Sequence, residues 1–325
     1  MDHSLTRRAA LGAALAFTAC AAIAQGGYPD HPLRIVVPQP AGGGFDFVAR
    51  TLADRLGKQL GQPVVVENRP GSGTVIGTDL VAKAPADGYT LLLGSVSNLA
   101  LNMGMYRNLP YDSLRDFEPL GLAVAYSYTL MARKELPQAT LKEMIAYAKA
   151  HPKKLNYASA GNGSGQHVIA AALWHAAGVE LTHVPYRGAQ AAYQDLIGGR
   201  VDLFFDLSST ARTQIDAGTV RALAVSGAAR MPTQPDIPTI AQTGATQLEL
   251  ESWFGLFAPA KTPPAILERL RTELARVIAM PEVTETFRKA GGKPLALSAA
   301  DTRALVQKDV ERWSRTVREL DIRPE

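Results

Sequence analysis

Short runs of β-branched and other apolar residues alternate with helical patterns along almost the whole chain. Residues 33–37 have the composition of a strand, and residues 46–60 carry apolar side chains at helical spacing. Strands that alternate with helices are typical of parallel sheets, because a parallel connection needs a crossover that is usually a helix. The sequence therefore predicts an α/β fold.

The same alternation predicts the remaining elements. Further strands are expected at 64–66, 90–93, 120–124, 155–158, 183–185, 201–205, 220–225 and 251–258, and helices at 74–84, 166–177 and 189–197. Thr140 and Glu143 have the spacing of a capping box for a helix that runs to Ala150. Prolines 263 and 264 are expected to start another helix, and Ser298 with Asp301 a last one with a regular apolar stripe.

A chain of 325 residues usually exceeds one hydrophobic core, so two lobes are expected. The strand and helix pattern restarts near Tyr128, and the apolar stripe of the last helix needs a surface to pack on. We therefore expect a first lobe from residues 25–124 and 251–325 and a second lobe from residues 125–250. The two chain crossings, near 123–128 and 251–254, would form a hinge.

The N-terminus has the pattern of a secretory signal peptide. Arg7 and Arg8 precede an apolar run at 9–19, and the small residues Ala22 and Ala24 follow. The run is shorter than the roughly 20 residues that a membrane helix needs. Residues 1–24 are therefore expected to be removed by cleavage near Ala24, which predicts a periplasmic protein. The general and the twin-arginine export routes both remain open, as does lipidation of Cys20.

Composition excludes several kinds of chemistry. Cys20 is the only cysteine, so a chain cleaved after Ala24 has no thiolate and no disulfide. The 34 basic and 30 acidic residues are mixed along the chain without blocks. Such a mild excess does not favour a nucleic-acid partner.

A glycine-rich segment at residues 38–46 connects the first expected strand to its helix. Ligands of open α/β sheets bind beyond the carboxyl ends of strands, where such a turn exposes backbone N–H groups and a helix N-terminus to an anion. The segment can also be explained as a tight turn with Asp46 as the helix N-cap. The two interpretations are compatible.

A second loop of the same kind, at residues 156–167, joins a strand to a helix in the second lobe. Neither loop contains Lys or Arg, so a carboxylate held by backbone amides and hydroxyl groups is favoured over a phosphate. His167 is explained either as a contact in the cleft or as a residue that caps the helix. A third glycine segment, at 71–77, lacks the spacing of a dinucleotide motif and is interpreted as the start of a helix.

Enzyme motifs are missing from the sequence: it has no phosphate-loop lysine, no Gly-x-Ser-x-Gly and no His-Glu-x-x-His. His167, His175 and His183 are spaced eight residues apart over an expected helix and a strand, and they do not form a metal set. No cofactor and no metal are expected. The alternative function is an α/β hydrolase or transferase that uses Asp46, His167 and Asp206.

The chain as a whole resembles the Bug family, after Bordetella uptake genes, which are the periplasmic solute-binding proteins of tripartite tricarboxylate transporters. The residues that carry the resemblance are 28–29, 40–43 with Asp46, 67–71, 87–90, 109–112, 116–119, 161–164 with His167, 183–188 and 198–199. The resemblance implies a two-lobed "Venus flytrap" whose two glycine loops grip a ligand carboxylate, partly through water. It implies ligands such as organic acids, acidic amino acids or aromatic acids.

The resemblance and the loop patterns together predict the binding residues. They are Pro40, Ala41, Gly42, Gly43, Phe45, Asp46, Ser95, Ser159, Gly161, Gly163, Ser164, His167 and Asp206. Phe45 stands where many relatives carry a small hydroxyl residue, which indicates a more apolar contact beside the carboxylate. The implied partner is a two-component membrane permease, and a monomer is expected. The alternative to transport is a signalling function, in which the ligand-loaded protein docks on a sensor kinase.

Overall fold

The computed structural model describes residues 27–320 and 322. The predicted signal peptide and Cys20 lie outside the described residues. Within residues 27–320 and 322, every helix is too short or too polar to cross a membrane.

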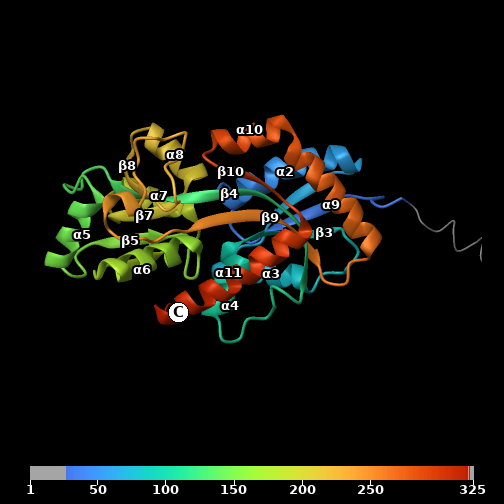
Figure 1. Cartoon of the computed structure of the whole chain (residues 1–325), viewed down its shortest axis with the longest axis horizontal. Coiled ribbons are helices and arrows are strands. Elements are labelled where there is room, and N and C mark those ends of the chain that lie inside the picture. Colours follow the sequence, from blue (N-terminus) through green and yellow to red (C-terminus); the bar gives the residue numbers. More distant parts are fainter. Residues whose placement is uncertain (1–26, 321, 323–325) are drawn as a thin grey trace, which may run out of the picture.

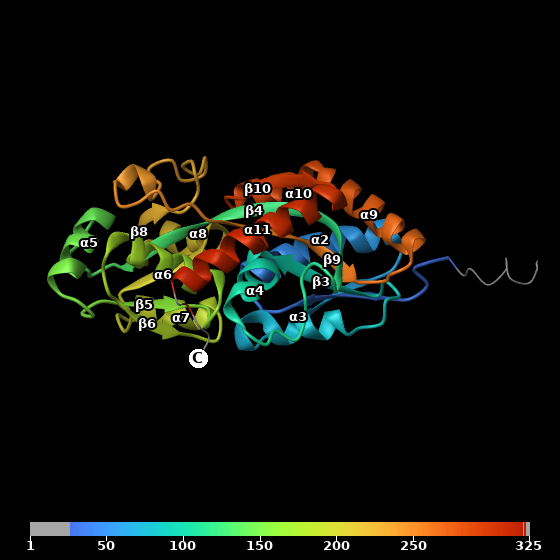
Figure 2. The same ribbon diagram turned by 60° about the horizontal axis from the view of Figure 1, so that its bottom comes forward.

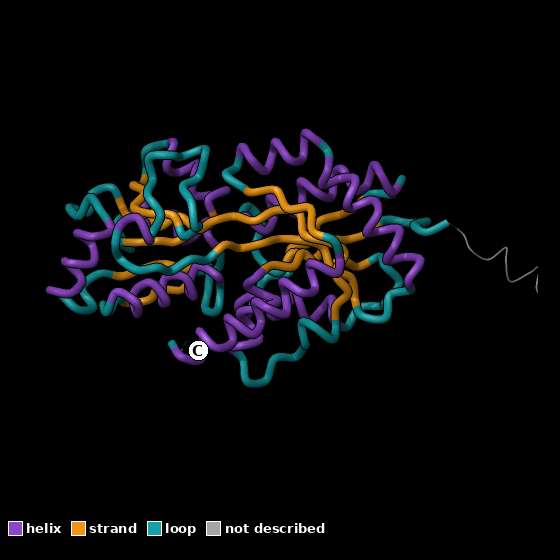
Figure 3. The backbone as a smooth tube through the Cα atoms, viewed as in Figure 1, coloured by secondary structure: helices purple, strands orange, loops and turns teal. Residues whose placement is uncertain are grey.

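Ten strands of the described chain form one mixed sheet, with the order β2-β1-β3-β9-β4-β7-β5-β6 and with β8 and β10 also paired to β4. Figure 3 shows the strands running along the centre of the elongated molecule. The strands are β1 (Leu33–Val37), β2 (Val64–Asn68), β3 (Thr90–Ser95), β4 (Phe117–Arg133), β5 (Asn156–Ser159), β6 (Thr182–Pro185), β7 (Leu203–Leu207), β8 (Val220–Val225), β9 (Glu251–Pro259) and β10 (Lys293–Leu297).

Helices follow most of these strands and cover the sheet. They are α2 (Gly44–Leu60), α3 (Val75–Ala82), α4 (Asn102–Met105), α5 (Leu141–Ala150), α6 (Gly165–Ala177), α7 (Ala189–Ile197), α8 (Ser208–Asp216), α9 (Pro264–Ala279), α10 (Pro281–Lys289) and α11 (Ala299–Glu319). Short helical turns lie at Ser72–Thr74, Ser97–Leu101 and Ala241–Thr243.

The strands divide into two lobes (Figure 1). In the first lobe, β2, β1 and β3 are parallel, and β9, β4 and β10 add antiparallel pairs. In the second lobe, β6, β5 and β7 are parallel, and β4 and β8 are antiparallel to their neighbours. The predicted α/β class is thus confirmed.

The long strand β4 belongs to both lobes. From Phe117 to Ser127 it pairs with β9, and from Tyr128 to Arg133 it pairs with β7 and β8. The predicted strand at 120–124 was therefore too short, and no break occurs near Tyr128. After Gly121 the strand is apolar or small and is buried on both faces, so nothing in its sequence stops it.

Capping residues in the sequence correctly predicted the starts of helices α5 and α11. The Thr140 and Glu143 capping box is present, and Ser298 caps α11 by accepting a hydrogen bond from the backbone of Asp301. The prediction that Asp46 is the N-cap of its helix was wrong, because α2 begins at Gly44 with Gly43 in the N-cap position. The small glycines allow the helix to start early and leave Asp46 inside the first turn.

Four helices and strands of the described chain were not predicted separately: α4, α8, α10 and β10. Helix α8 begins with Ser208 and Ser209 and carries few apolar residues, so its sequence lacks a clear apolar stripe. The apolar stripe of α11 was predicted to need a packing surface, and Val306, Trp313 and Val317 of that helix are buried. Helix α11 lies across the first lobe near α4 (Figure 2).

Candidate functional site

Five helices of the described chain begin at the cleft between the lobes. Helices α2 and α3 follow the parallel strands β1 and β2 of the first lobe, and α6, α7 and α8 follow β5, β6 and β7 of the second. The N-cap or first turn of each of these helices lines one of two cavities in the cleft. The positive ends of five helix dipoles are therefore directed at the cleft.

The lobes touch at several points between these helix starts. Gln190 Nε2 of α7 donates to the carbonyl oxygen of Gly42 at 2.9 Å. The backbone N–H of Gly165 donates to Ser97 Oγ at 3.1 Å, which joins the start of α6 to the first lobe. A side chain on Gly44 would collide with Leu207 of the opposite lobe. The two lobes are therefore in contact across the cleft beside its two cavities.

The larger cavity has a volume of about 670 Å³. It is lined by Pro38, Gln39, Pro40, Pro70, Gly71, Ser72, Gly73, Thr74 and Tyr106 of the first lobe and by Ala160, Gly161, Asn162, Ser164, Pro185, Tyr186, Arg187 and Gly188 of the second. Among these lining residues Arg187 is the only charged one.

The smaller cavity, of about 540 Å³, has the contact between Gln190 and Gly42 in its wall. Its lining is Gly42, Gly43, Asp46, Phe47, Arg50, Thr51, Gln190, Tyr193, Ser209, Thr210, Thr213 and Gln214. Its two charged residues, Asp46 and Arg50, form an ion pair with 2.8 Å between Oδ2 and Nε. The charges of the smaller cavity therefore compensate each other.

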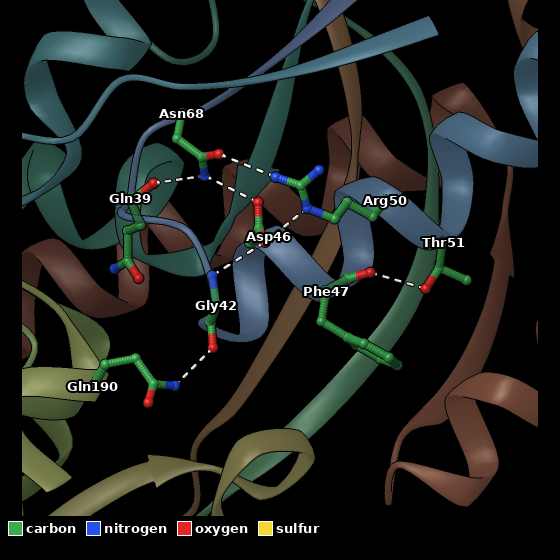
Figure 4. Close-up of polar contacts among 8 residues, drawn as sticks. All are labelled: Gln39, Gly42, Asp46, Phe47, Arg50, Thr51, Asn68 and Gln190. Carbon is green, nitrogen blue, oxygen red and sulfur yellow. Dashed lines mark hydrogen bonds and ion pairs between the residues drawn. The ribbon is translucent and has the colours of Figure 1, made fainter.

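Asp46 holds the first glycine loop in shape (Figure 4). Its carboxylate accepts hydrogen bonds from the backbone N–H of Gly42, from Arg50 Nε and from Asn68 Nδ2. Burial opposes ionisation, but the hydrogen bonds from Arg50, Gly42 and Asn68 outweigh it and keep the pKa of Asp46 below its ordinary value. The ionised carboxylate fixes the loop rather than presenting free oxygens to the cavity.

The second glycine loop is held by a cap and by hydroxyl contacts. Ser164 is the N-cap of α6, where its Oγ accepts from the backbone N–H of His167 at 3.3 Å. Ser159 Oγ accepts from the N–H of Gly161 and lies 2.7 Å from His183 Nε2. Ser164 is thus the N-cap residue, whereas His167 Nδ1 accepts from the N–H of Gly163 at 3.3 Å at the same helix start. The His167 ring stacks on His183 with centroids 3.9 Å apart.

The third glycine segment, at residues 71–77, also lines the larger cavity. Ser72 and Thr74 both have positive φ, 45° and 84°, which is uncommon for residues other than glycine. Asn102 Nδ2 donates to Thr74 Oγ1, and Tyr106 OH donates to the carbonyl oxygen of Ser72. These bonds from the first lobe hold a strained loop at the cavity wall.

The structure distributes the predicted site residues over three places. Pro40, Gly161 and Ser164 line the larger cavity, and Gly42, Gly43 and Asp46 line the smaller one. Ala41 is exposed between them. The other predicted residues, which line neither cavity, are Phe45, Ser95, Ser159, Gly163, His167 and Asp206.

Several of these other residues belong to the packed interior. Phe45 is buried and packs edge to face on Phe254, with ring centroids 5.0 Å apart. Ser95 bonds to Asn98 at the end of β3. Asp206 is 1% exposed, and burial raises its pKa, although its oxygens accept from Gln166 and Tyr193 among other donors.

The three side chains of the alternative enzyme do not meet in one cavity. Of Asp46, His167 and Asp206, only Asp46 lines a cavity, and it is paired with Arg50. Within residues 27–320 and 322 there is also no group of three or more His, Cys, Asp or Glu residues that could hold a metal ion.

Sequence reasoning missed Tyr106, Arg187 and Gln190 as parts of the site. Tyr186, Arg187 and Gly188 follow β6, so the rule that ligands bind beyond the carboxyl ends of strands could have identified them. Tyr106 follows no strand of the parallel set and is brought to the cavity only by tertiary packing.

Comparison with known proteins gives a consistent result. The profile described as the tripartite tricarboxylate transporter family receptor matches residues 48–322. The chain is 40% identical over 314 residues to a UPF0065 protein from the tcbD-tcbE intergenic region of Pseudomonas sp. strain P51, with 96% of this chain and 93% of the relative covered. It is 35% identical over 293 residues to protein BugT of Bordetella pertussis, with 90% of each chain covered.

Solved structures share the fold. The periplasmic binding protein BugD has a TM-score of 0.87 and 36% identity, with 91% of this chain and 99% of that chain covered. An R. palustris protein with adipate has a TM-score of 0.88 and 34% identity, with coverage of 91% and 99%. MatC from Rhodopseudomonas palustris, with bound malate, has a TM-score of 0.85 and 32% identity, with coverage of 89% and 100%.

The family match and these structures agree with the two-lobed architecture and its central cleft. The chain belongs to the receptor family of tripartite tricarboxylate transporters, which includes the Bug proteins.

Proposed function

We propose that this chain captures a small carboxylate in the periplasm and presents it to a tripartite tricarboxylate-type membrane transporter. Family membership supports the receptor role. The similar R. palustris proteins with adipate and with malate support a small organic acid as the solute.

The observation that carries the proposal is the convergence of five helix N-termini on the interlobe cavities. Backbone N–H groups at helix starts bind anions without a charged side chain. The larger cavity has no acidic residue in its lining, so nothing there repels a carboxylate. Because the amides come from both lobes, a bound anion stabilises the arrangement in which the lobes touch.

The proposed binding residues remain those predicted from the sequence, and the direct contacts are the ones that line the larger cavity, Pro40, Gly161 and Ser164. The proposed lobe boundaries also remain: residues 25–124 with 251–325, and residues 125–250. In this assignment the crossings lie within β4 and at the start of β9, where Ser127 pairs with Glu251. Bending of these strands would open the cleft.

We further propose that the protein binds the acid without changing it and acts as a monomer beside a two-component permease. The dispersal of Asp46, His167 and Asp206 supports binding without catalysis. Cleavage near Ala24 would release the mature chain into the periplasm.

The test is a binding and turnover measurement on the purified mature protein. Calorimetry with malate, adipate, citrate, aspartate and nicotinate should identify at least one acid that binds, and that acid should raise the melting temperature by ligand linkage. Nuclear magnetic resonance should recover the acid unchanged after long incubation. Conversion of the acid into a product would refute a pure binding function.

A further inference from the structure

We propose that Asp206 is a positioning residue, which fixes the second lobe's half of the binding site by joining the N-terminal turns of α6, α7 and α8. The inference rests on the proposed function, because these three helices begin at the cleft that would hold the acid. It separates a residue that sets the geometry of the site from the residues that contact the solute.

The carboxylate of Asp206 connects three helices. Gln166 Nε2 of α6 donates to Oδ1 at 3.0 Å, and Tyr193 OH of α7 donates to Oδ2 at 2.9 Å. Thr210 Oγ1 of α8 also donates to Oδ2. The three helices follow the parallel strands β5, β6 and β7, and Asp206 itself lies in β7. One side chain therefore links three helices that are separate in the sequence.

Each of these links lies close to the cleft. Ser164, two residues before Gln166, lines the larger cavity, whereas Tyr193 and Thr210 line the smaller one. A shift of any of these helix starts would move its backbone N–H groups relative to a carboxylate bound in the cleft. Asp206 lines neither cavity, so its effect on the solute passes through the helices.

The burial of this carboxylate is costly for the fold. Asp206 is 1% exposed, and its hydrogen bonds within residues 27–320 and 322 come from uncharged donors and none from Lys, Arg or His. Burial raises the pKa of Asp206, and the hydrogen bonds act in the opposite direction. Replacement of buried charged groups by well-packed apolar ones is often neutral or stabilising. The carboxylate is therefore better explained by what it positions than by a gain in stability.

A carboxylate suits this position because it can accept several hydrogen bonds at once. Bonds to an ionised acceptor are also stronger than bonds between neutral groups. Gln166 and Thr210 lie in the first turns of α6 and α8, so the positive ends of these helix dipoles offset part of the cost of the buried charge. An asparagine has the same shape but one acceptor oxygen and two donor hydrogens, so it cannot satisfy all three donors.

The experiment measures affinity and local order together. Wild type and Asp206→Asn are titrated by calorimetry with malate, adipate, citrate, aspartate and nicotinate. Asp206→Asn should raise the Kd of the best acid about tenfold or more, because the helix starts lose their common acceptor. Hydrogen exchange followed by mass spectrometry should be faster at the starts of α6, α7 and α8 in this variant than in wild type.

Asp202→Asn is the matched control. Asp202 is also buried in the second lobe, where it pairs with Arg133 and accepts from the N–H of Asn156. It directly precedes β7, at the end of the strand opposite to Asp206. Asp202→Asn should lower the urea midpoint but keep the wild-type Kd. A purely structural role for Asp206 would give both variants the same change in Kd, and that result would overturn the proposal.

A second variant tests a single bond. Gln166 lines neither cavity, and Gln166→Met removes its donor while keeping its length. This variant should raise the Kd about threefold to tenfold, and the double variant with Asp206→Asn should bind no more weakly than Asp206→Asn alone. If Asp206→Asn does not fold, wild-type affinity in Gln166→Met overturns the proposal. A wild-type protein that binds none of the acids counts against the proposed function, and unchanged hydrogen exchange in Asp206→Asn would then count against Asp206 separately.

Discussion

The imidazole rings of His167 and His183 lie face to face beneath the second glycine loop. The N–H of Gly163 donates to His167 Nδ1, and His183 Nε2 contacts Ser159 Oγ, so both rings are tied to the loop. Burial lowers the pKa of His167 to about 4. Burial, together with the nearby His167, also lowers the pKa of His183. The stacked pair is therefore neutral at neutral pH, as two parallel rings in contact require.

This pair predicts a loss of stability in acid. The unfolded chain protonates these imidazoles near pH 6.5, whereas the folded His167 protonates only near pH 4. The unfolded state thus binds more protons between these values, and the free energy of unfolding falls as the pH drops from about 6.5 to about 4. The slope is at most about 1.4 kcal/mol per pH unit for each histidine.

Urea unfolding across this pH range would measure the effect. His183→Gln removes one of the two imidazoles and should give a shallower pH dependence than wild type. His175→Gln, on the exposed side of α6, should keep the wild-type dependence. Parallel pH profiles for wild type and His183→Gln would contradict this account of the pair.

At the scale of single elements, the second lobe has one helix cap at the cavity wall and one far from it. Ser164 caps α6 at the wall of the larger cavity, and the next residue, Gly165, bonds to Ser97 in the first lobe. Thr140 caps α5 through a capping box at an exposed position. Figure 1 shows α5 at the outer end of the molecule, away from the first lobe.

The caps predict separable effects on stability and binding. Ser164→Ala and Thr140→Ala should each lower the free energy of unfolding by about 1 kcal/mol, because each leaves a backbone N–H of the first turn without its acceptor. Ser164→Ala should also raise the Kd for the bound acid about fivefold or more, since the α6 amides lose their fixed position. Thr140→Ala should leave the Kd unchanged. Denaturation and calorimetry on both variants test this, and equal effects on Kd would rule out a special place for α6 in the site.

At the scale of the whole molecule, the strands β4 and β9 run between the two lobes (Figure 1). A few hydrogen bonds also join the lobes across the cleft. The hydrogen bond from Gln190 to the carbonyl of Gly42 joins the lobes at the wall of the smaller cavity. A hydrogen bond that exists only when the lobes touch favours closure by about 1 kcal/mol. In the proposed function, closure would be the step by which a transporter distinguishes a loaded receptor from an empty one.

Removal of this contact should shift the protein toward the open arrangement. Gln190→Ala should raise the Kd for the acid about fivefold and increase the radius of gyration of the ligand-free protein in small-angle scattering. Gln194→Ala, an exposed position on the same helix, is the control and should match wild type. If Gln190→Ala has the affinity and the scattering profile of wild type, the hydrogen bond does not stabilise the closed arrangement.

Features that depend on neighbouring residues could be predicted from the sequence. Helix α7 begins and ends where predicted, at Ala189 and Ile197, and the Thr140 cap and the strand at 220–225 are also as predicted. Apolar spacing, capping side chains and glycine turns act over a few residues, so these features depend only on residues that are close in sequence. The two glycine loops were recognised for the same reason.

Tertiary structure determined which residues share the cavities with the glycine loops. Arg187 and Tyr106 are distant in sequence, and no local pattern indicates that they share a cavity. Asp206 follows the predicted strand at 201–205 and was therefore expected in the binding site. Packing instead buries it against Gln166 and Tyr193. The length of β4 likewise depends on having β9 beside one part and β7 beside the other. Local chemistry determined the elements and the glycine-rich turns, and long-range packing determined which of those turns meet, because only contacts between distant segments bring two helix starts to one cavity.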